Sequence, residues 1–185
     1  MKDPRYKSDF KRFSYINRCL KGKEILDMGS KEGYLHELFL KNNPDKKIYS
    51  CDLKDSDFNF DFNKSFKIKK KFDTIVAGEI IEHLENPTYF IKECKKILNE
   101  QGRLIITTPN SIGIQYIKNP EWTVNQERGH INSFTMPMIK KILTNNSFKI
   151  IYSDYINAFW INNPLQIISF IIKRLRPDLI VVADS

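Results

Sequence analysis

The sequence predicts an α/β fold of three layers, in which helices cover both faces of a doubly wound, mostly parallel sheet. Short runs rich in Ile, Val and Leu alternate along the chain with longer amphipathic segments, and glycine or proline marks boundaries between them. Such alternation is typical of parallel strands joined by right-handed helical crossovers. A length of 185 residues suits one domain, so we expect residues 1–185 to fold as a single unit.

The individual elements are predicted from the period of the apolar residues. Over residues 7–20 aromatic and aliphatic side chains recur with a period near 3.6, and we expect residues 1–22 to form a helical lid at the edge of the site. The pattern is poor between residues 53 and 71, where residues 61–63 are the candidate for the third strand. The remaining strands are predicted at 23–28, 47–52, 72–77, 103–107, 148–154 and 179–183, and the remaining helices at 32–42, 88–99 and 135–145.

Composition and charge limit the classes to which the protein can belong. No apolar run approaches the roughly 18 residues that a membrane span requires, and the chain starts with charged residues, so we expect a cytoplasmic protein. Cys19, Cys51 and Cys94 are too widely spaced for a metal knuckle or a disulfide framework. The formal net charge of +8 is compatible with RNA, anionic lipid or an acidic substrate as partner, but we interpret the dense lysine run at residues 64–71 as a solvated loop.

A glycine-containing turn after the first predicted strand is the clearest sign of a cofactor site. Asp27 lies in that strand, Gly29 allows the backbone to approach a ligand closely, and Gly33 allows the next helix to pack closely on the sheet. Asp52 ends the second strand, where a carboxylate can accept hydrogen bonds from both hydroxyls of a ribose. A dinucleotide-dependent dehydrogenase and an enzyme with another nucleoside cofactor are both compatible with these residues.

The turn and a later segment resemble the class I S-adenosylmethionine-dependent methyltransferases, and the resemblance extends over most of the chain. Asp27, Gly29 and Gly33 match the family's acid-x-Gly-x-Gly-x-Gly motif, while Lys31 occupies the place of its middle glycine. Residues 72–87 (FDTIVAGEIIEHLENP) resemble the signature of its fourth strand. The missing glycine argues against a dehydrogenase, because a pyrophosphate needs several converging backbone N–H groups, whereas adenosylmethionine carries no phosphate.

The resemblance implies a Rossmann-like sheet of seven strands in which the last strand is antiparallel and lies beside the fifth. It also implies an enzyme that uses S-adenosylmethionine, with Asp52 at the ribose and with Asp61 and Phe62 at the adenine. For Asp61 and Phe62, a polar loop with one buried phenylalanine is an equally good interpretation. The full set of cofactor-binding residues that we expect is Asp27, Gly29, Gly33, Asp52, Leu53, Asp61, Phe62 and Glu79.

Two carboxylates and two imidazoles are candidates for the chemistry of the site. Glu79, Glu82 and His83 follow the fourth strand with a spacing that places them on one face of a helical turn, and His130 follows the fifth strand. Ligands bind at the carboxyl edge of such sheets, so we expect the four side chains to converge there. In one interpretation the four side chains hold Mg²⁺, Mn²⁺ or a related ion. In another the enzyme uses no metal, and His130, with His83, is the base or the substrate contact. A merely structural His130 is the third interpretation.

The same segment is similar to that of O-methyltransferases of quinone biosynthesis and of RNA 3′-terminal 2′-O-methyltransferases. We therefore expect O-methylation of a small molecule, a quinone precursor or a glycan, and residues 109–110 are expected to shape the acceptor pocket. One alternative is an RNA 2′-O-methyltransferase. The other is a catalytically inactive, cofactor-binding partner subunit whose motif has changed at Lys31.

The last predicted hairpin carries an insertion at residues 155–177. Its residues 159–176 are apolar with a basic end, which is typical either of a helix at a membrane surface or of a helix that covers the core and walls the substrate pocket. We adopt the second interpretation. The acceptor and the oligomeric state have no signature in the sequence.

Overall fold

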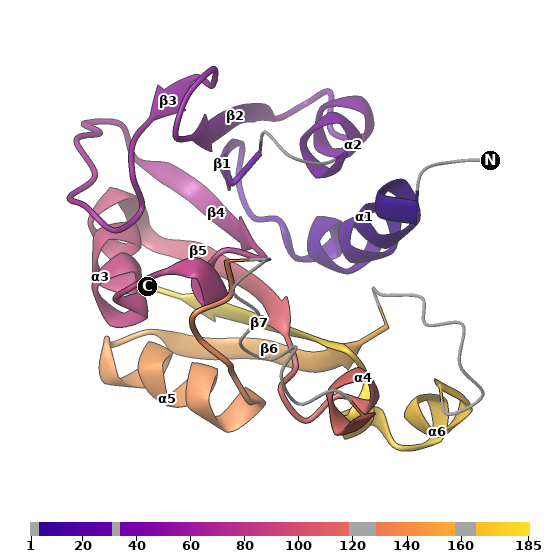
Figure 1. Cartoon of the computed structure of the whole chain (residues 1–185). Coiled ribbons are helices and arrows are strands. Elements are labelled where there is room, and N and C mark those ends of the chain that lie inside the picture. The colour runs from indigo at the N-terminus through magenta and orange to yellow at the C-terminus, as the bar shows by residue number, and fades with distance from the viewer. Residues whose placement is uncertain (1–3, 31–33, 119–128, 158–165) are drawn as a thin grey trace.

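The computed structural model describes residues 4–30, 34–118, 129–157 and 166–185, and its centre is a seven-stranded sheet with helices on both faces (Figure 1). The strand order is β3-β2-β1-β4-β5-β7-β6. Neighbouring strands are parallel except for β7, which runs antiparallel to both β5 and β6. This arrangement confirms the predicted α/β fold and the position of its antiparallel last strand.

All strands except β3 overlap the predicted ranges. β3 lies before residues 61–63, because Phe58 and Asn59 pair with Cys51 and Asp52 of the preceding strand. A strand of two residues is too short to show an alternating pattern, which explains the wrong prediction. The strands are β1 Glu24–Met28, β2 Lys47–Asp52, β3 Phe58–Asn59, β4 Phe72–Gly78, β5 Leu98–Pro109, β6 Lys149–Ile156 and β7 Asp178–Asp184.

The helices also follow the predicted order, with short additions that the sequence pattern does not show. The start of α3 illustrates the local cause of helix formation: the side chain of Asn86 accepts a hydrogen bond from the N–H of Tyr89 at 2.9 Å, and Pro87 begins the first turn. The α-helices are α1 Pro4–Ile16, α2 Leu35–Asn42, α3 Pro87–Ile97, α4 Ile114–Lys118, α5 Met136–Asn145 and α6 Gln166–Ile171. Single 3-10 turns are η1 Asn17–Cys19, η2 Ile81–His83 and η5 Lys173–Leu175.

Both faces of the central strands are buried. On one face, strand residues such as Ile75 belong to a cluster with Phe90 of α3 and Leu143 of α5. On the other face, their neighbours in the same strands, such as Val76, belong to a cluster with Phe13 of α1 and Phe39 of α2. A strand that is buried on both sides reads as a nearly continuous apolar run, which is why the sequence marks these strands clearly.

The segment between β6 and β7 connects Ile156 to Asp178 and carries the short helix α6. Ile167, Phe170 and Ile171 of α6 are exposed and do not pack on the core. The described part of the insertion is therefore not the expected cover, and residues 158–165 lie outside the described residues. Within the described ranges, no helix is long and apolar enough to cross a membrane.

Candidate active site

The carboxyl ends of β1, β2, β4 and β5 meet at one edge of the sheet, and the predicted site residues lie in or beside the loops that follow them (Figure 1). After β1 the chain turns at Gly29, whose φ is 72° and whose N–H donates to the carbonyl of Cys51 at 2.8 Å. A Cβ at this position would lie 3.0 Å from Cδ1 of Ile80, so both the backbone conformation and the close approach favour glycine. Lys31 and Gly33 lie outside the described residues.

Asp27 is buried in β1, and its carboxylate has a partner within the protein. Its Oδ2 lies 3.1 Å from Nδ1 of His36 on α2. Burial raises the pKa of Asp27, while the hydrogen bond to His36 acts in the opposite direction. Asp27 therefore joins the first strand to the helix that follows the glycine turn.

Asp52 and Leu53 lie beside this turn, because Cys51, the acceptor of the Gly29 hydrogen bond, immediately precedes them. Oδ1 of Asp52 accepts a hydrogen bond from the N–H of Leu53 at 2.7 Å. The Leu53 side chain is exposed. The second strand thus ends in a carboxylate and an accessible apolar side chain at the carboxyl edge.

Asp61 and Phe62 follow β3 and have different surroundings. Asp61 accepts a hydrogen bond at 2.9 Å from the N–H of Asn63, and this bond is the largest cause of the lowered pKa of Asp61. Phe62 is partly buried and packs edge-on against Phe90 of α3, with ring centroids 6.0 Å apart. Phe62 is therefore part of an aromatic cluster beside the third strand.

The chain leaves β4 in a strained conformation at Glu79. Its φ is 57°, a value that residues other than glycine rarely adopt, and its N–H donates to the carbonyl of Thr107 at 2.9 Å. The Glu79 carboxylate lies 3.3 Å from Nη2 of Arg12, a buried residue of α1. Arg12 also pairs at 2.9 Å with Asp9, whose other oxygen accepts a hydrogen bond from the N–H of Tyr34 at 2.8 Å. These contacts connect α1 to the loop after β4 and to the start of α2.

Arg12 is a site residue that the sequence analysis missed. Burial disfavours its charge, but the carboxylates around it, Glu79 above all, raise the pKa of Arg12 above its ordinary value. In the sequence, Arg12 is one of several basic residues in the first helix. Arg12 differs from these residues only in its position three residues after Asp9, a spacing that is typical of an ion pair on a helix. The lid function predicted for residues 1–22 stays a prediction.

Glu82 is the buried carboxylate of the site. Its Oε2 accepts a hydrogen bond from Oγ1 of Thr108 at 2.9 Å, whereas its Oε1 is buried and has no hydrogen-bond partner among the described residues. Burial and, to a lesser extent, the neighbouring Glu79 raise the pKa of Glu82 well above its ordinary value. The backbone carbonyl of Glu82 accepts hydrogen bonds from Ile131 and Asn132 at 3.0 and 2.9 Å. These bonds fix the loop that carries His130 against η2.

His83 and His130 lie next to each other, with ring centroids 4.7 Å apart in a T-shaped arrangement. Nδ1 of His83 lies 3.0 Å from the carbonyl oxygen of Gly129. A carbonyl can only accept a hydrogen bond, so we assign the proton to Nδ1, which leaves Nε2 of the neutral ring as an acceptor. Nε2 of His83 lies 4.0 Å from Oε1 of Glu82.

The structure reduces the predicted set of four metal ligands to three. Glu82, His83 and His130 each offer a ligand atom within 4.8 Å of the others. Glu79 is not a member of this group, because its carboxylate is turned towards Arg12. The positive φ of Glu79 directs its side chain away from the helical face on which the spacing would place it.

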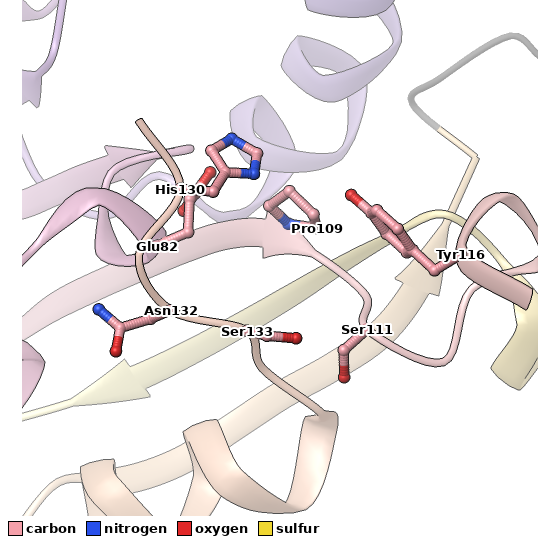
Figure 2. A pocket seen from close by; sticks show the side chains of 7 residues that line it. All are labelled: Glu82, Pro109, Ser111, Tyr116, His130, Asn132 and Ser133. Carbon is pink, nitrogen blue, oxygen red and sulfur yellow. The ribbon is translucent and has the colours of Figure 1, made fainter. Parts of the chain in front are cut away.

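A small pocket adjoins this group of three residues (Figure 2). In Figure 2, His130 and Glu82 lie on one side of Pro109 and Tyr116 lies on the other. Burial raises the pKa of Tyr116, so its hydroxyl keeps its proton at neutral pH. Most of the lining side chains can form hydrogen bonds, which suits a polar acceptor. The lining residues are Glu82, Pro109, Ser111, Tyr116, His130, Asn132 and Ser133.

Of the two residues predicted to shape the pocket, only Pro109 lines it. Asn110 is buried, and its Nδ2 donates to the carbonyls of Arg174 and Arg176 at 2.9 and 2.7 Å. Its backbone N–H donates to the carbonyl of Pro177 at 2.7 Å. Asn110 therefore fastens the end of the insertion to β5.

Comparison with known proteins identifies the family. Residues 3–153 match the family described as methyltransferase domain. The chain belongs to this methyltransferase family. The methyltransferase is 29% identical over 123 residues to the ubiquinone biosynthesis O-methyltransferase of Pelagibacter ubique (strain HTCC1062), a match that covers 59% of this chain and 51% of the relative. It spans about half the length of the curated relatives that it matches.

Solved structures of methyltransferases have the same fold. An S-adenosylmethionine-dependent methyltransferase from Archaeoglobus fulgidus aligns with a TM-score of 0.69 at 16% identity, over 98% of this chain and 94% of that one. The 1,6-didemethyltoxoflavin-N1-methyltransferase of Burkholderia thailandensis, solved with S-adenosylhomocysteine, aligns with a TM-score of 0.63 at 13% identity, over 98% of this chain and 78% of that one. The family match confirms the predicted methyltransferase family, and the solved structures confirm its fold.

Proposed function

We propose that this methyltransferase transfers a methyl group to a hydroxyl oxygen of a small polar acceptor, with quinone precursors and glycans as the candidate classes. The observation that carries the proposal is the pocket in which His130 and Glu82 lie beside hydroxyl and amide side chains. The curated relatives are named O-methyltransferases, which supports oxygen as the acceptor atom.

The residues at the carboxyl edge fit S-adenosylmethionine. Gly29 keeps the turn after β1 free of a side chain, and Asp52 offers a carboxylate to the ribose hydroxyls. Glu79 offers a carboxylate to the ammonium group of the cofactor's amino acid, and the buried Arg12 pairs with that carboxylate. When bound, the cofactor supplies a methyl group that its sulfonium already activates. The proposed site is completed by Asp27, Gly33, Leu53, Asp61 and Phe62.

His130 is proposed as the general base. An imidazole within hydrogen-bonding reach of a hydroxyl can take its proton and so make the oxygen a better nucleophile. His83 acts on His130 indirectly, because its Nδ1–H donates to Gly129, the residue before His130, and its ring packs against that of His130. His130 would accept the hydroxyl proton of the acceptor as its oxygen takes up the methyl group that the cofactor supplies.

The same group of side chains fits a divalent cation. The buried Oε1 of Glu82 has no hydrogen-bond partner in the described part of the chain, and Nε2 of His83 offers a lone pair towards it. As an alternative to a metal-free base at His130, Glu82, His83 and His130 would hold the ion, and a mixture of carboxylate and imidazole ligands suits Mn²⁺ better than Mg²⁺. Such an ion would lower the pKa of an acceptor hydroxyl.

The proposed reaction is tested by a labelled-methyl transfer screen across phenols, sugars and RNA ends. We expect transfer to a phenol or sugar hydroxyl, and we expect His130→Gln to lower kcat by about 100-fold or more with little change in KM. The exposed Lys141→Gln on α5 is the matched control and should be fully active. Full activity of His130→Gln would remove His130 from the reaction. Activity that is untouched by EDTA would reject the metal and leave His130 as a metal-free base.

The cofactor site is tested by calorimetry with S-adenosylmethionine. We expect Asp52→Ala to weaken binding by about 1–3 kcal/mol, because the ribose hydroxyls lose a charged acceptor. Asp45→Ala, which removes an exposed carboxylate just before the opposite, amino end of β2, is the control and should bind like the wild type. An unchanged affinity of the Asp52 variant would remove Asp52 from the site.

RNA is a less well supported acceptor. Several members of the lysine run at residues 64–71 contact the protein itself: Lys70 pairs with Glu24 at 2.7 Å, and Lys64 pairs with Asp61 at 3.4 Å. Methyl transfer to RNA ends, together with salt-sensitive RNA binding, would overturn the small-molecule proposal. Cofactor binding without transfer to any acceptor would favour the inactive partner subunit.

A further inference from the structure

The helix α6 and the residue after it form a ridge whose apolar side chains point into solvent. Ser169, the one polar residue of the ridge, is fully buried, while Ile171 is 79% exposed. This is the reverse of an ordinary surface helix, which buries its apolar face. We call residues 167–172 the α6 ridge, and its exposed apolar residues are Ile167, Ile168, Phe170, Ile171 and Ile172.

Hydrogen bonds fix this orientation. Nη1 of Arg176 donates to the carbonyl of Tyr155 at 3.0 Å, and its Nε donates to the carbonyl of Ser169 at 3.4 Å. The side chain of Asn110 holds the carbonyls of Arg174 and Arg176. The bond between Arg176 and Ser169 holds the buried side of α6 against the rest of the connection, so the exposure of the apolar residues is built into the segment between β6 and β7.

Cationic side chains adjoin the ridge. Lys173 and Arg174 follow it directly and are exposed. Within the described ranges, the ion pair of Lys173 is a 4.0 Å contact with Asp154, and the chain as a whole has a formal net charge of +8. Segments that lie at a membrane surface combine apolar residues with cations. The apolar residues enter the boundary between headgroups and acyl chains, and the cations attract anionic lipids.

We propose that the α6 ridge binds the surface of a membrane that contains anionic lipids. A second copy of the chain is a poorer occupant, because an interface between two ridges would bring the cations of two positively charged chains together. A lipid surface instead complements both the apolar side chains and the charge of Lys173 and Arg174. An exposed apolar patch of this kind also needs an explanation in a protein that is free in water.

The ridge lies on the same side of the molecule as the pocket. Asn110 holds the end of the ridge segment to β5, and the preceding residue, Pro109, lines the pocket. Gln115 of α4 donates to the carbonyl of Pro177 at 2.8 Å, which joins the insertion to the helix that carries Tyr116 (Figure 1). Membrane binding would therefore bring the pocket close to the bilayer surface.

The test is flotation of the full chain with vesicles, which requires no methyl transfer and no known acceptor. We expect binding to vesicles of phosphatidylcholine with phosphatidylglycerol and much weaker binding to phosphatidylcholine alone. The double variant Phe170→Ser, Ile171→Ser should lower the partition coefficient by about tenfold or more, because two large apolar side chains no longer enter the bilayer. The matched control is Leu40→Ser, Met138→Ser, which removes two comparably exposed apolar side chains elsewhere and should bind like the wild type.

A second pair of variants tests the charge. Lys173→Gln, Arg174→Gln should lower binding to the anionic vesicles by about tenfold or more, since each cation near such a surface contributes about 1 kcal/mol. Lys141→Gln, Lys149→Gln, which removes two exposed lysines elsewhere, is the control and should have a smaller effect. Thermal unfolding checks that every variant is folded.

Three results would overturn the proposal. The first is the absence of binding to either kind of vesicle, and the second is binding that the Phe170 and Ile171 changes leave intact. The third is a dimer, detected by sedimentation velocity, that the same changes dissociate while vesicle binding is absent. That result would assign the ridge to an interface between copies of the chain.

Discussion

The helices α1 and α6 both lie near the active site, but they are attached to the rest of the molecule in opposite ways. α1 buries Phe13 and Ile16 in the core and places the buried cation of Arg12 between carboxylates of the site. Among the α6 residues whose exposure is described, only Ser169 is buried, and the apolar side chains point outward. The comparison shows that a helix can lie near the site without packing into the hydrophobic core of the protein. α1 belongs to the folded unit that carries the candidate site, whereas α6 is held through the hydroxyl and the carbonyl of Ser169 and directs its apolar side chains outward.

The largest effect on this comparison should come from Arg12→Met. Removal of the cation leaves Glu79 and Asp9 without their buried partner, so we expect the free energy of unfolding to fall by about 3 kcal/mol, with weaker cofactor binding. Urea unfolding and calorimetry measure the two effects. Arg18→Met in the neighbouring η1 is the control, because the Arg18 guanidinium donates to an exposed carbonyl and lies over the ring of Tyr15, and not between buried carboxylates. Equal stability of both variants would show that α1 is not anchored through Arg12.

The next largest effect should distinguish the apolar residues of the two helices. Ile16→Ala in α1 removes a fully buried side chain and should lower the free energy of unfolding by about 2–5 kcal/mol. Ile171→Ala in α6 changes an exposed side chain and should alter it by less than about 0.5 kcal/mol. Similar losses in the two variants, measured by urea unfolding, would contradict the distinction between a core helix and an attached one.

The smallest effect concerns the junction that leads from α1 into β1, and it depends on pH. The carboxylate of Asp73 accepts hydrogen bonds from the N–H groups of Lys23 and Glu24 at 2.8 and 3.0 Å, and the bond from Glu24 is the largest cause of the lowered pKa of Asp73. Because the pKa is lower in the folded state, this carboxylate stabilises the fold above its unfolded pKa of about 4 and loses that contribution as the pH falls through the folded value.

We therefore expect the free energy of unfolding to decrease in acid below about pH 4, and the decrease to be smaller in Asp73→Asn. Urea unfolding at a series of pH values makes the measurement. The same pH dependence in the wild type and in the variant would show that Asp73 does not contribute.

Much of the fold could be predicted because the central strands are buried on both faces. Ile75 and Val76 are neighbours that pack on opposite layers, so β4 appears in the sequence as a continuous apolar run. β3 could not be placed, because Phe58 and Asn59 acquire their strand character from pairing with β2 and not from a pattern of their own. The exposure of the α6 ridge could not be predicted either, since a run of apolar residues looks the same whether it points inward or outward.

The convergence of the candidate site residues was predictable where residue spacing and strand order decide the geometry. Glu82, His83 and His130 converge because β4 and β5 are neighbours whose carboxyl ends meet at one edge. Glu79 was misplaced because its backbone conformation departs from the helical turn that the spacing assumes. Tyr116 of the short helix α4 and the loop residues Ser111, Asn132 and Ser133 were missed, because neither a single helical turn nor a loop has a period that would reveal which side chains meet.

The position of β7 between β5 and β6 has a consequence for how the acceptor side of the enzyme can diversify. β6 and β7 are paired from one end of the hairpin to the other, so the sheet does not depend on the length of the segment that connects them. Doubling the length of a flexible connection costs only about 0.6 kcal/mol. The region between Ile156 and Asp178 is therefore a place where evolution, or a protein engineer, can exchange one recognition segment for another while the catalytic scaffold remains unchanged.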